Sequence, residues 1–151
     1  MANIDARVVK ELRDETGASI MMVKKALTQA AGDHARALEV LKNLGHNAAL
    51  KKESRETHAG RIEAYVHGGS KIGVLLELRS ETDFVSRNEE FGKLAHEIAM
   101  HVAATNPVSV EELIEQPFIR DEKETIGDLV KKASASFGEK IEIRRFVRFS
   151  L

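Results

Sequence analysis

Cysteine, net charge and long apolar runs are what this chain of 151 residues lacks. Without cysteine, the chain can form neither a disulfide nor a thiolate metal site. Its formal net charge of -1 removes the usual electrostatic case for nonspecific binding to nucleic acid. No apolar run approaches the length that crosses a membrane, and the first residues hold no apolar stretch typical of a signal peptide. We therefore expect a cytoplasmic protein that binds neither membrane nor nucleic acid.

Nucleotide-binding motifs are missing as well. The chain contains neither GxGxxG nor GxxxxGK[ST], and Gly68-Gly69 lies between two strand-like runs, a position typical of a turn. We expect no direct nucleotide binding and no cofactor.

A helical pattern contains His96-Glu97 followed by His101, which is close to the HExxH motif of zinc peptidases. Histidines four residues apart lie about 40° from each other around a helix, whereas a spacing of five separates them by about 140°. No obvious third ligand follows in the sequence. Solvated or hydrogen-bonded histidines are therefore the favoured interpretation, with a metallopeptidase as an alternative. We expect no catalytic and no metal-binding residues.

The composition that is present, 42% apolar and 31% charged, is typical of a soluble globular protein. A chain of this length suffices for one ordinary domain, or for a small module and a modest second domain. The period of the apolar residues changes near residue 60, from the helical value of about 3.6 to the strand value of about 2. The change favours the second arrangement.

Residues 1–45 show three short runs of apolar residues at helical spacing, the first of them over residues 4–16. The capping residues and glycines that bound these runs are Gly17, Ser19, Gly32, Asp33 and Gly45. We expect a compact module of three helices, the third ending at Gly45. Because the module is small, we expect it to be only marginally stable alone.

The second of these helices begins with Ile20, Met21 and Met22, which cannot all face one small core. We expect Met21 or Met22 at the surface, where a flexible thioether side chain suits contact with a partner. A loosely packed edge of the core is the alternative. After this module, residues 46–59 are polar, contain alanines and show no apolar stripe, which predicts a helical or fraying linker.

Residues 60–151 predict a domain of strands and helices. Alternating apolar residues on both sides of Gly68-Gly69 favour a β-hairpin, and residues 141–149 form another strand-like run. Helical patterns cover residues 86–105 and 125–136, and Thr125 with Asp128 three residues later is placed to cap the second of these helices. A lone hairpin is unstable, so we expect the last strand to complete a three-stranded antiparallel sheet with both helices on one face. The predicted fold class is α+β.

The junction between the predicted hairpin and the first of these helices, residues 81–91, holds the most informative polar pattern. Ser86 precedes Glu89 by three residues, which predicts a capping box and a helix that starts at Ser86. The residues before Ser86 would then form a turn that holds Asp83 and Phe84 outward on a rigid base. In the alternative interpretation, Asp83 caps a helix and Phe84 fills the core.

The sequence Thr82-Asp83-Phe84-Val85, followed by Arg87-Asn88-Glu89-Glu90-Phe91, resembles the signature of bacterial elongation factor Ts. Other stretches that resemble the family, in the family's order, are Val9-Lys10-Glu11-Leu12-Arg13, Thr16-Gly17-Ala18, Lys24-Lys25-Ala26-Leu27, Gln116-Pro117-Phe118-Ile119 and Gly138-Glu139-Lys140-Ile141. The resemblance covers most of the chain. It implies a ubiquitin-associated-type (UBA-like) fold for residues 1–45 and a core domain of the dimerisation type for residues 60–151.

The resemblance also implies a function: guanine-nucleotide exchange on elongation factor Tu, a protein GTPase, in translation elongation. Such a factor is not an enzyme, because exchange makes and breaks no covalent bond. The partner-binding residues that the resemblance implies are Thr82, Asp83, Phe84, Val85, Arg87 and Asn88 in a wedge beside the nucleotide site, and Ile20, Met21 and Lys24 in the first module. A homodimer through the core sheet is implied too. A protein-binding adaptor with a UBA-like module and no exchange activity remains the alternative.

The chain departs from the family between Asn106-Pro107 and Gln116-Pro117. Family members carry a long helical segment there, whereas this chain has eight residues. The second core repeat and the coiled-coil insertion of long members are absent too. We therefore expect no partner contacts from these parts.

Overall fold

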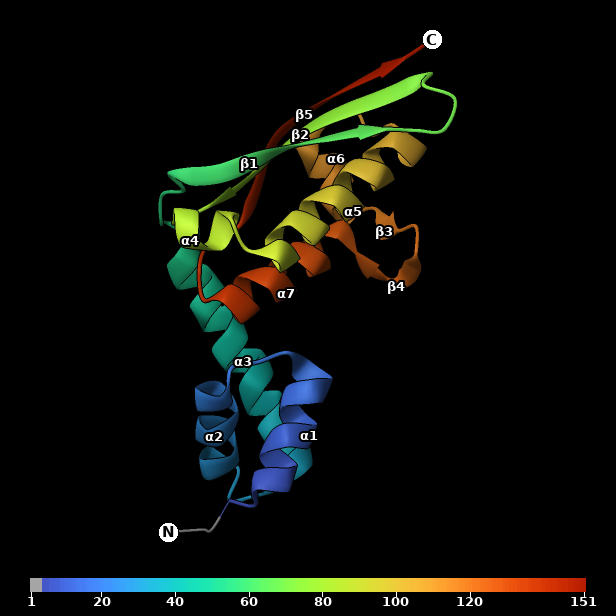
Figure 1. Cartoon of the computed structure of the whole chain (residues 1–151). Helices are drawn as coiled ribbons and strands as arrows, with labels where there is room; N and C mark the ends of the chain where they lie inside the picture. The colour runs from blue at the N-terminus through green and yellow to red at the C-terminus, as the bar shows by residue number, and fades with distance from the viewer. Residues whose placement is uncertain (1–3) are drawn as a thin grey trace. The chain divides into compact units, whose positions relative to one another are not determined.

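In the computed structural model, residues 4–151 are described, apart from the side chains of His46, Ala48, Ala49 and Leu50. The chain divides into two compact units, Met1–Ser54 and Arg55–Leu151, which we call the helical unit and the sheet unit (Figure 1). The division lies inside the predicted linker. Residues 46–53 of the linker are helical, which is one of the two forms predicted for it.

Three helices make up the described part of the helical unit: α1 (Ala6–Thr16), α2 (Ile20–Gln29) and α3 (His34–Glu53). Each begins after a polar residue whose side chain accepts a hydrogen bond from a backbone N–H of the first turn; these residues are Asp5, Ser19 and Asp33. Gly17 ends α1 in the left-handed conformation, with φ of 66°, as its position predicted. The three helices predicted for this part of the chain are confirmed.

The helices of this unit enclose a small core of their own. Its fully buried members, at 0% exposure, are Leu12, Val23, Ala26, Leu27 and Ala37. They come from all three helices. No residue of the sheet unit belongs to this cluster of described residues.

The predicted end of the third helix at Gly45 is wrong, because α3 continues to Glu53. A glycine ends a helix when it adopts the left-handed conformation, as Gly17 does at φ of 66°. In a helix interior, glycine costs about 1 kcal/mol relative to alanine, which weakens the helix without ending it.

An antiparallel sheet of three strands forms the upper layer of the sheet unit in Figure 1, as predicted. Its strands are β1 (Ala59–Val66), β2 (Ile72–Ser80) and β5 (Glu142–Ser150), with β2 in the middle. The β1–β2 turn places Gly69 at φ of 84°, a conformation that favours glycine. The three-stranded antiparallel sheet and the α+β fold class are confirmed.

Helices cover one face of this sheet. Helix α5 (Glu89–Thr105) packs against β1 and β2, and α7 (Ile126–Phe137) packs against α5 and the short α6 (Val110–Glu115). The core between them includes Leu76 of β2, Phe91 and Ile98 of α5, and Ile126 of α7. The predicted capping box of α7 is present, since Thr125 and Asp128 exchange hydrogen bonds between side chain and backbone.

The sequence did not predict a small second sheet, in which β3 (Pro117–Phe118) pairs with β4 (Asp121–Thr125). Strand β4 consists mostly of charged residues, a composition depleted in strands. The β3–β4 hairpin follows α6 directly. Helix α6 itself follows α5 after the connection that is short in this chain.

The other face of the three-stranded sheet carries exposed apolar side chains. In the strand register, Leu75 of β2 lies between Ala64 and Val147, and Gly73 lies between Val66 and Phe149. The large apolar side chains exposed on these three strands are Ile62, Val66, Leu75, Val147 and Phe149. We call this surface the open sheet face.

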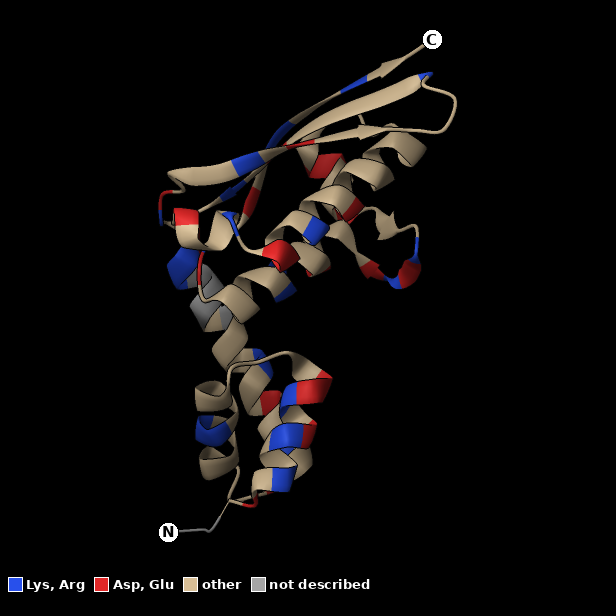
Figure 2. Cartoon of the chain, viewed as in Figure 1, with Lys and Arg blue, Asp and Glu red and all other residues tan. Residues whose placement is uncertain are grey.

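Charges of both signs are interleaved along α1 (Figure 2), whereas the charged residues of α2 are lysines and those of α6 are glutamates. Among the described residues, no helix is both long enough and apolar enough to span a membrane.

Candidate functional site

The residues that follow β2 form a turn, as predicted, and this turn is a single turn of helix, α4 (Asp83–Ser86). Thr82 caps it: its Oγ1 accepts a hydrogen bond from the Val85 N–H at 3.5 Å. The Ser86 hydroxyl donates to the Asp83 carbonyl oxygen at 3.2 Å. We call residues 82–86 the 82–86 turn. Its conformation is fixed by hydrogen bonds at both ends.

The 82–86 turn separates its side chains sharply by exposure. The Phe84 ring is 86% exposed, whereas Val85 is 3% exposed and belongs to the core of the sheet unit. Asp83 is exposed beside Phe84, and Ser86 is buried. The interpretation in which Phe84 fills the core is therefore wrong. An acidic and an aromatic side chain both stand at the surface, on a backbone anchored by Val85.

The predicted start of the long helix at Ser86 is wrong, because α5 begins at Glu89. Asn88 is its cap, and the Asn88 Oδ1 accepts a hydrogen bond from the Glu90 N–H at 2.8 Å. Ser86 is instead the last residue of α4, and its hydroxyl donates to the Asp83 carbonyl within that turn. Arg87 joins the two helices and is exposed, as is Asn88.

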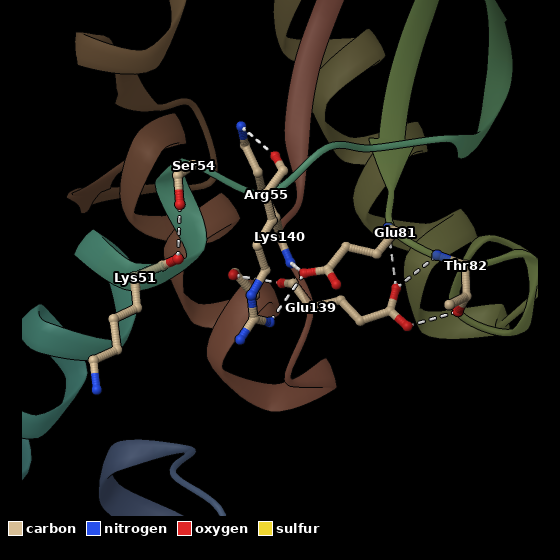
Figure 3. A network of polar contacts seen from close by, with 8 residues as sticks. Lys51, Ser54, Arg55, Glu81, Thr82, Glu139 and Lys140 are labelled. Atoms are coloured by element: carbon tan, nitrogen blue, oxygen red, sulfur yellow. Dashed lines mark hydrogen bonds and ion pairs between the residues drawn. The ribbon is translucent and has the colours of Figure 1, made fainter.

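The carboxylate of Glu139, from a distant part of the sequence, lies against the residues that enter the 82–86 turn, as Figure 3 shows. Glu139 Oε2 accepts hydrogen bonds from the N–H groups of Glu81 and Thr82, both at 3.1 Å. Glu139 Oε1 accepts one from the Thr82 hydroxyl at 2.6 Å. In the opposite direction, the Glu81 carboxylate accepts a hydrogen bond from the Lys140 N–H at 2.6 Å.

Sequence reasoning missed this part of the site. In the sequence, Glu139 belongs to a stretch that resembles the family, but no local pattern gives it a role. A contact between residues 57 positions apart leaves no trace in local periodicity or in capping patterns.

In the helical unit, the residues of the predicted partner contact lie on α2. Met21 is 80% exposed and Ile20 is 45% exposed, and Lys24 one turn later is exposed too. Met22 is partly buried against the core of this unit. The expectation that one of the two methionines stands at the surface is confirmed, and Met21 is that residue.

The two histidines of α5 have separate environments. The His96 Nδ1 lies 3.3 Å from Glu63 Oε1 at the surface. His101 is fully buried: its Nδ1 accepts from the Ile119 N–H at 3.4 Å, so Nε2 carries the hydrogen and donates to Gln116 Oε1 at 2.9 Å. Burial lowers the pKa of His101, against a smaller opposite effect of the hydrogen bond with Gln116.

Both ring nitrogens of His101 are thus occupied by protein groups, which leaves none to bind a metal together with His96. Among the described residues, no group of three or more His, Cys, Asp and Glu side chains is arranged to hold a metal ion. The favoured interpretation, solvated or hydrogen-bonded helix histidines, is confirmed.

Comparison with known proteins identifies the family of this chain. The family model described as Elongation factor TS matches residues 81–151, a range that contains both the 82–86 turn and Glu139. Elongation factor Ts of Oleidesulfovibrio alaskensis is 40% identical over 196 aligned positions, covering 100% of this chain and 99% of the relative. The chain belongs to the elongation factor Ts family.

Other members show the same extent of similarity. Elongation factor Ts of Thermosipho melanesiensis is 41% identical over 193 positions, covering 98% of each chain. Elongation factor Ts of Microcystis aeruginosa is 40% identical over 197 positions, covering 100% of this chain and 78% of the relative. The similarity to the family therefore includes the helical unit as well as the sheet unit.

The alignments also measure what this chain lacks. Against the Oleidesulfovibrio alaskensis relative, 196 aligned positions cover a chain of 151 residues, so 45 positions of the relative have no counterpart here. A gap of this size agrees with the missing helical segment noted between Asn106-Pro107 and Gln116-Pro117. In the structure, α5 and α6 are joined directly at this place by residues 106–109.

Proposed function

We propose that this chain promotes GDP release from elongation factor Tu by inserting the 82–86 turn beside the magnesium and phosphate site of the GTPase. Membership of the elongation factor Ts family supports the exchange role in translation elongation. The observation that carries the mechanism is the 86% exposure of Phe84 on a turn whose next residue, Val85, is buried. A large ring held outside the protein on a fixed backbone is suited to enter a partner.

Exchange needs differential binding and no covalent chemistry. A factor lowers the affinity of a GTPase for GDP when it binds the nucleotide-free form more tightly than the GDP-bound form. No catalytic acid, base or nucleophile is required, and we propose no enzymatic activity. In this mechanism Phe84 displaces the elements that support the magnesium ion and the phosphate loop. Asp83 brings a negative charge to the same place.

The second contact in the proposal is the surface of α2 formed by Ile20, Met21 and Lys24. Its support is the exposure of two apolar side chains beside a lysine. Apolar side chains in such a position contribute most when a partner covers them, and a methionine adapts its shape to the partner. In the proposal this surface supplies affinity, whereas the 82–86 turn supplies the effect on the nucleotide.

We further propose a homodimer formed through the open sheet face. Exposed side chains from three adjacent strands, among them Leu75, Val147 and Phe149, make this face apolar on a sheet whose other face is covered by helices. Two such faces can pack as a sandwich, in which inner side chains interdigitate at a spacing of about 10 Å. Light scattering should give the mass of two chains, and Leu75→Arg should reduce it to one.

The adaptor hypothesis, in which the helical unit binds another protein without any effect on nucleotide, has the exposed Ile20 and Met21 in its favour. It gives no role to the exposed Phe84. A cytoplasmic location and the lack of direct nucleotide, nucleic-acid and membrane binding remain predictions from the sequence.

The deciding experiment is the release of fluorescently labelled GDP from elongation factor Tu, with and without the full chain. Acceleration that saturates with concentration and is lost in Phe84→Ala is the expected result. A chain that binds elongation factor Tu without changing the rate of release would support the adaptor instead.

A further inference from the structure

We infer that Glu139 is a positioning residue for nucleotide exchange, acting through the 82–86 turn; this inference rests on the proposed function. Its carboxylate accepts three hydrogen bonds from the segment that leads into the turn. Two come from backbone N–H groups and one from the Thr82 hydroxyl. Hydrogen bonds to an ionised carboxylate are stronger than neutral ones, so this single side chain has a large share in holding the segment.

The support under Glu139 is itself fixed. Gly138 ends α7 in the left-handed conformation with φ of 73°. The Ser134 hydroxyl of α7 donates to the Glu139 carbonyl oxygen at 2.6 Å, and Ile141, just before β5, is buried in the core. The carboxylate therefore projects from a short connection that is anchored on both sides.

A second carboxylate ties the same two segments in the opposite direction. Glu81 accepts a hydrogen bond from the Lys140 N–H at 2.6 Å and one from the Arg55 guanidinium at 3.2 Å. The Lys140 ammonium group in turn donates to the Arg55 carbonyl at 3.1 Å. In each of the segments 81–82 and 139–140, a carboxylate thus accepts a hydrogen bond from a backbone N–H of the other segment, as Figure 3 shows. Such an arrangement restricts both the position and the direction of the chain as it enters α4.

The Thr82 hydroxyl transmits this restriction to the exposed residues. It donates its hydrogen to Glu139 and accepts from the Val85 N–H, so one oxygen joins Glu139 to the cap of α4. Because the hydroxyl hydrogen points toward Glu139, a lone pair is left to face Val85. Asp83 and Phe84 lie within the turn that this cap begins. Glu139 therefore controls the direction of Phe84 without contacting it.

A fixed turn matters for exchange because binding is weakened by the fraction of molecules that are not competent. If the 82–86 turn samples other conformations, the apparent affinity of the turn for the GTPase is its intrinsic affinity multiplied by the fraction of molecules in the correct conformation. Glu139→Ala should free the turn in this sense. Glu139→Gln keeps one carboxamide oxygen for the two backbone N–H groups, so it should retain most of the effect.

The test is a double-mutant cycle between Glu139 and Phe84, measured as the maximal rate of GDP release from elongation factor Tu. The variants are Glu139→Ala, Phe84→Ala and the double variant, all in the full chain. Asp128→Ala is the matched control, because Asp128 also accepts a hydrogen bond from a backbone N–H, that of Thr125 at 3.0 Å, but at the start of α7. Hydrogen exchange of the Glu81 and Thr82 amides reports the geometry without any partner.

We expect Glu139→Ala to lower the maximal rate about tenfold, the effect of losing about one net hydrogen bond. In the Phe84→Ala background the same substitution should have no further effect, because no ring remains to be positioned. The amides of Glu81 and Thr82 should exchange faster in Glu139→Ala and stay protected in Glu139→Gln. Asp128→Ala should lower thermal stability and leave the maximal rate unchanged.

Losses that multiply in the double variant would overturn the inference, since they would show that Glu139 acts independently of Phe84. A loss of rate in Asp128→Ala equal to that in Glu139→Ala would overturn it too, by assigning the effect to stability. If the unmodified chain does not accelerate release at all, the proposed function fails, and the inference fails with it. If Glu139→Ala accelerates GDP release as much as the unmodified chain does, the inference about Glu139 is wrong and the proposed function stands.

Discussion

Phe84 and Val85 are neighbours in the sequence and project from different sides of one helical turn, the first 86% exposed and the second 3% exposed. A turn of helix places consecutive side chains about 100° apart, so one can enter the core while the next faces solvent. The burial of Val85 thereby fixes the backbone from which Phe84 projects.

This relationship predicts a contrast between two phenylalanines. Phe84→Ala should change the free energy of unfolding by no more than about 0.5 kcal/mol, because the ring has little contact to lose. Phe91→Ala should lower it by about 3–5 kcal/mol, since Phe91 is fully buried on α5. Denaturant unfolding of both variants measures the difference. Only Phe84→Ala should remain folded and yet fail in GDP release; a large loss of stability in that variant would contradict the exposure of the ring.

The exchange proposal also predicts reciprocal antagonism. If the chain lowers the affinity of elongation factor Tu for GDP by some factor, GDP must lower the affinity of elongation factor Tu for the chain by the same factor. GDP with magnesium should therefore dissociate the complex. Titration calorimetry with the nucleotide-free and GDP-loaded GTPase measures both affinities, and equal values would contradict exchange.

Asp83 should contribute to that antagonism through its charge. A carboxylate brought close to phosphates and in competition with a magnesium ion disfavours both of them. Asp83→Asn should therefore reduce the difference between the two affinities more than it reduces binding to the nucleotide-free GTPase. An unchanged difference in the same titrations would exclude Asp83 from the mechanism.

Separate hydrophobic cores predict that the units fold independently. Every buried residue of the larger core cluster lies between Val74 and Ile143, inside the sheet unit. Deletion of residues 1–54 should leave the sheet folded, with its β-sheet circular dichroism and cooperative melting intact. Affinity for elongation factor Tu should fall, because Ile20, Met21 and Lys24 are removed. A truncated chain that does not melt cooperatively would show that the sheet unit depends on the helices.

The buried His101 predicts a loss of stability in mild acid. Its pKa is lowered in the folded protein by burial, whereas in the unfolded chain it titrates near 6.5. Below that pH the unfolded state binds a proton that the folded state does not bind, so the free energy of unfolding falls as the pH is lowered. The stabilisation that comes from neutral His101 is fully present above the pKa of the unfolded chain. Below that pH the free energy of unfolding falls by up to about 1.4 kcal/mol per pH unit.

Urea unfolding at several pH values between 8 and 5 measures this slope. His101→Gln removes the titrating group and should make the curve flatter over that range, although its stability at high pH will be lower. Equal slopes for the two proteins would show that another group is responsible.

The sequence predicted those features that depend on residues a few positions apart. The Thr125–Asp128 capping box and the glycine after α1 need only local geometry, and both are present. Ser86 and Glu89 had the same spacing, but Ser86 is buried in the preceding turn, and Asn88 lies closer to the start of α5. Ser86 and Asn88, two positions apart, both have side chains able to cap a helix, but Ser86 is the last residue of α4, which packs against β1 and β2.

Features that depend on distant residues were not predictable in this way. Strand β4 pairs with β3 in spite of its charged composition, and Glu124 of this strand pairs with Lys132 of α7, a contact that strand propensity does not reveal. Likewise, no local pattern relates Glu139 to Thr82. The sequence left two interpretations of Phe84 open, and the structure decides between them because Phe84 is exposed while its neighbour Val85 occupies the core.

The short passage from α5 to α6 bears on how this family can vary in length. Asn106 closes α5 in the left-handed conformation, with φ of 48°, and Ser109 opens α6 three residues later, so the two helix ends are completed by local residues. A loop inserted between them would add a closure cost that grows only with the logarithm of its length. This junction is therefore a natural point for grafting: a foreign helix, a reporter domain or the segment of a longer relative can be placed there, with the 82–86 turn and its supporting carboxylates left as they are.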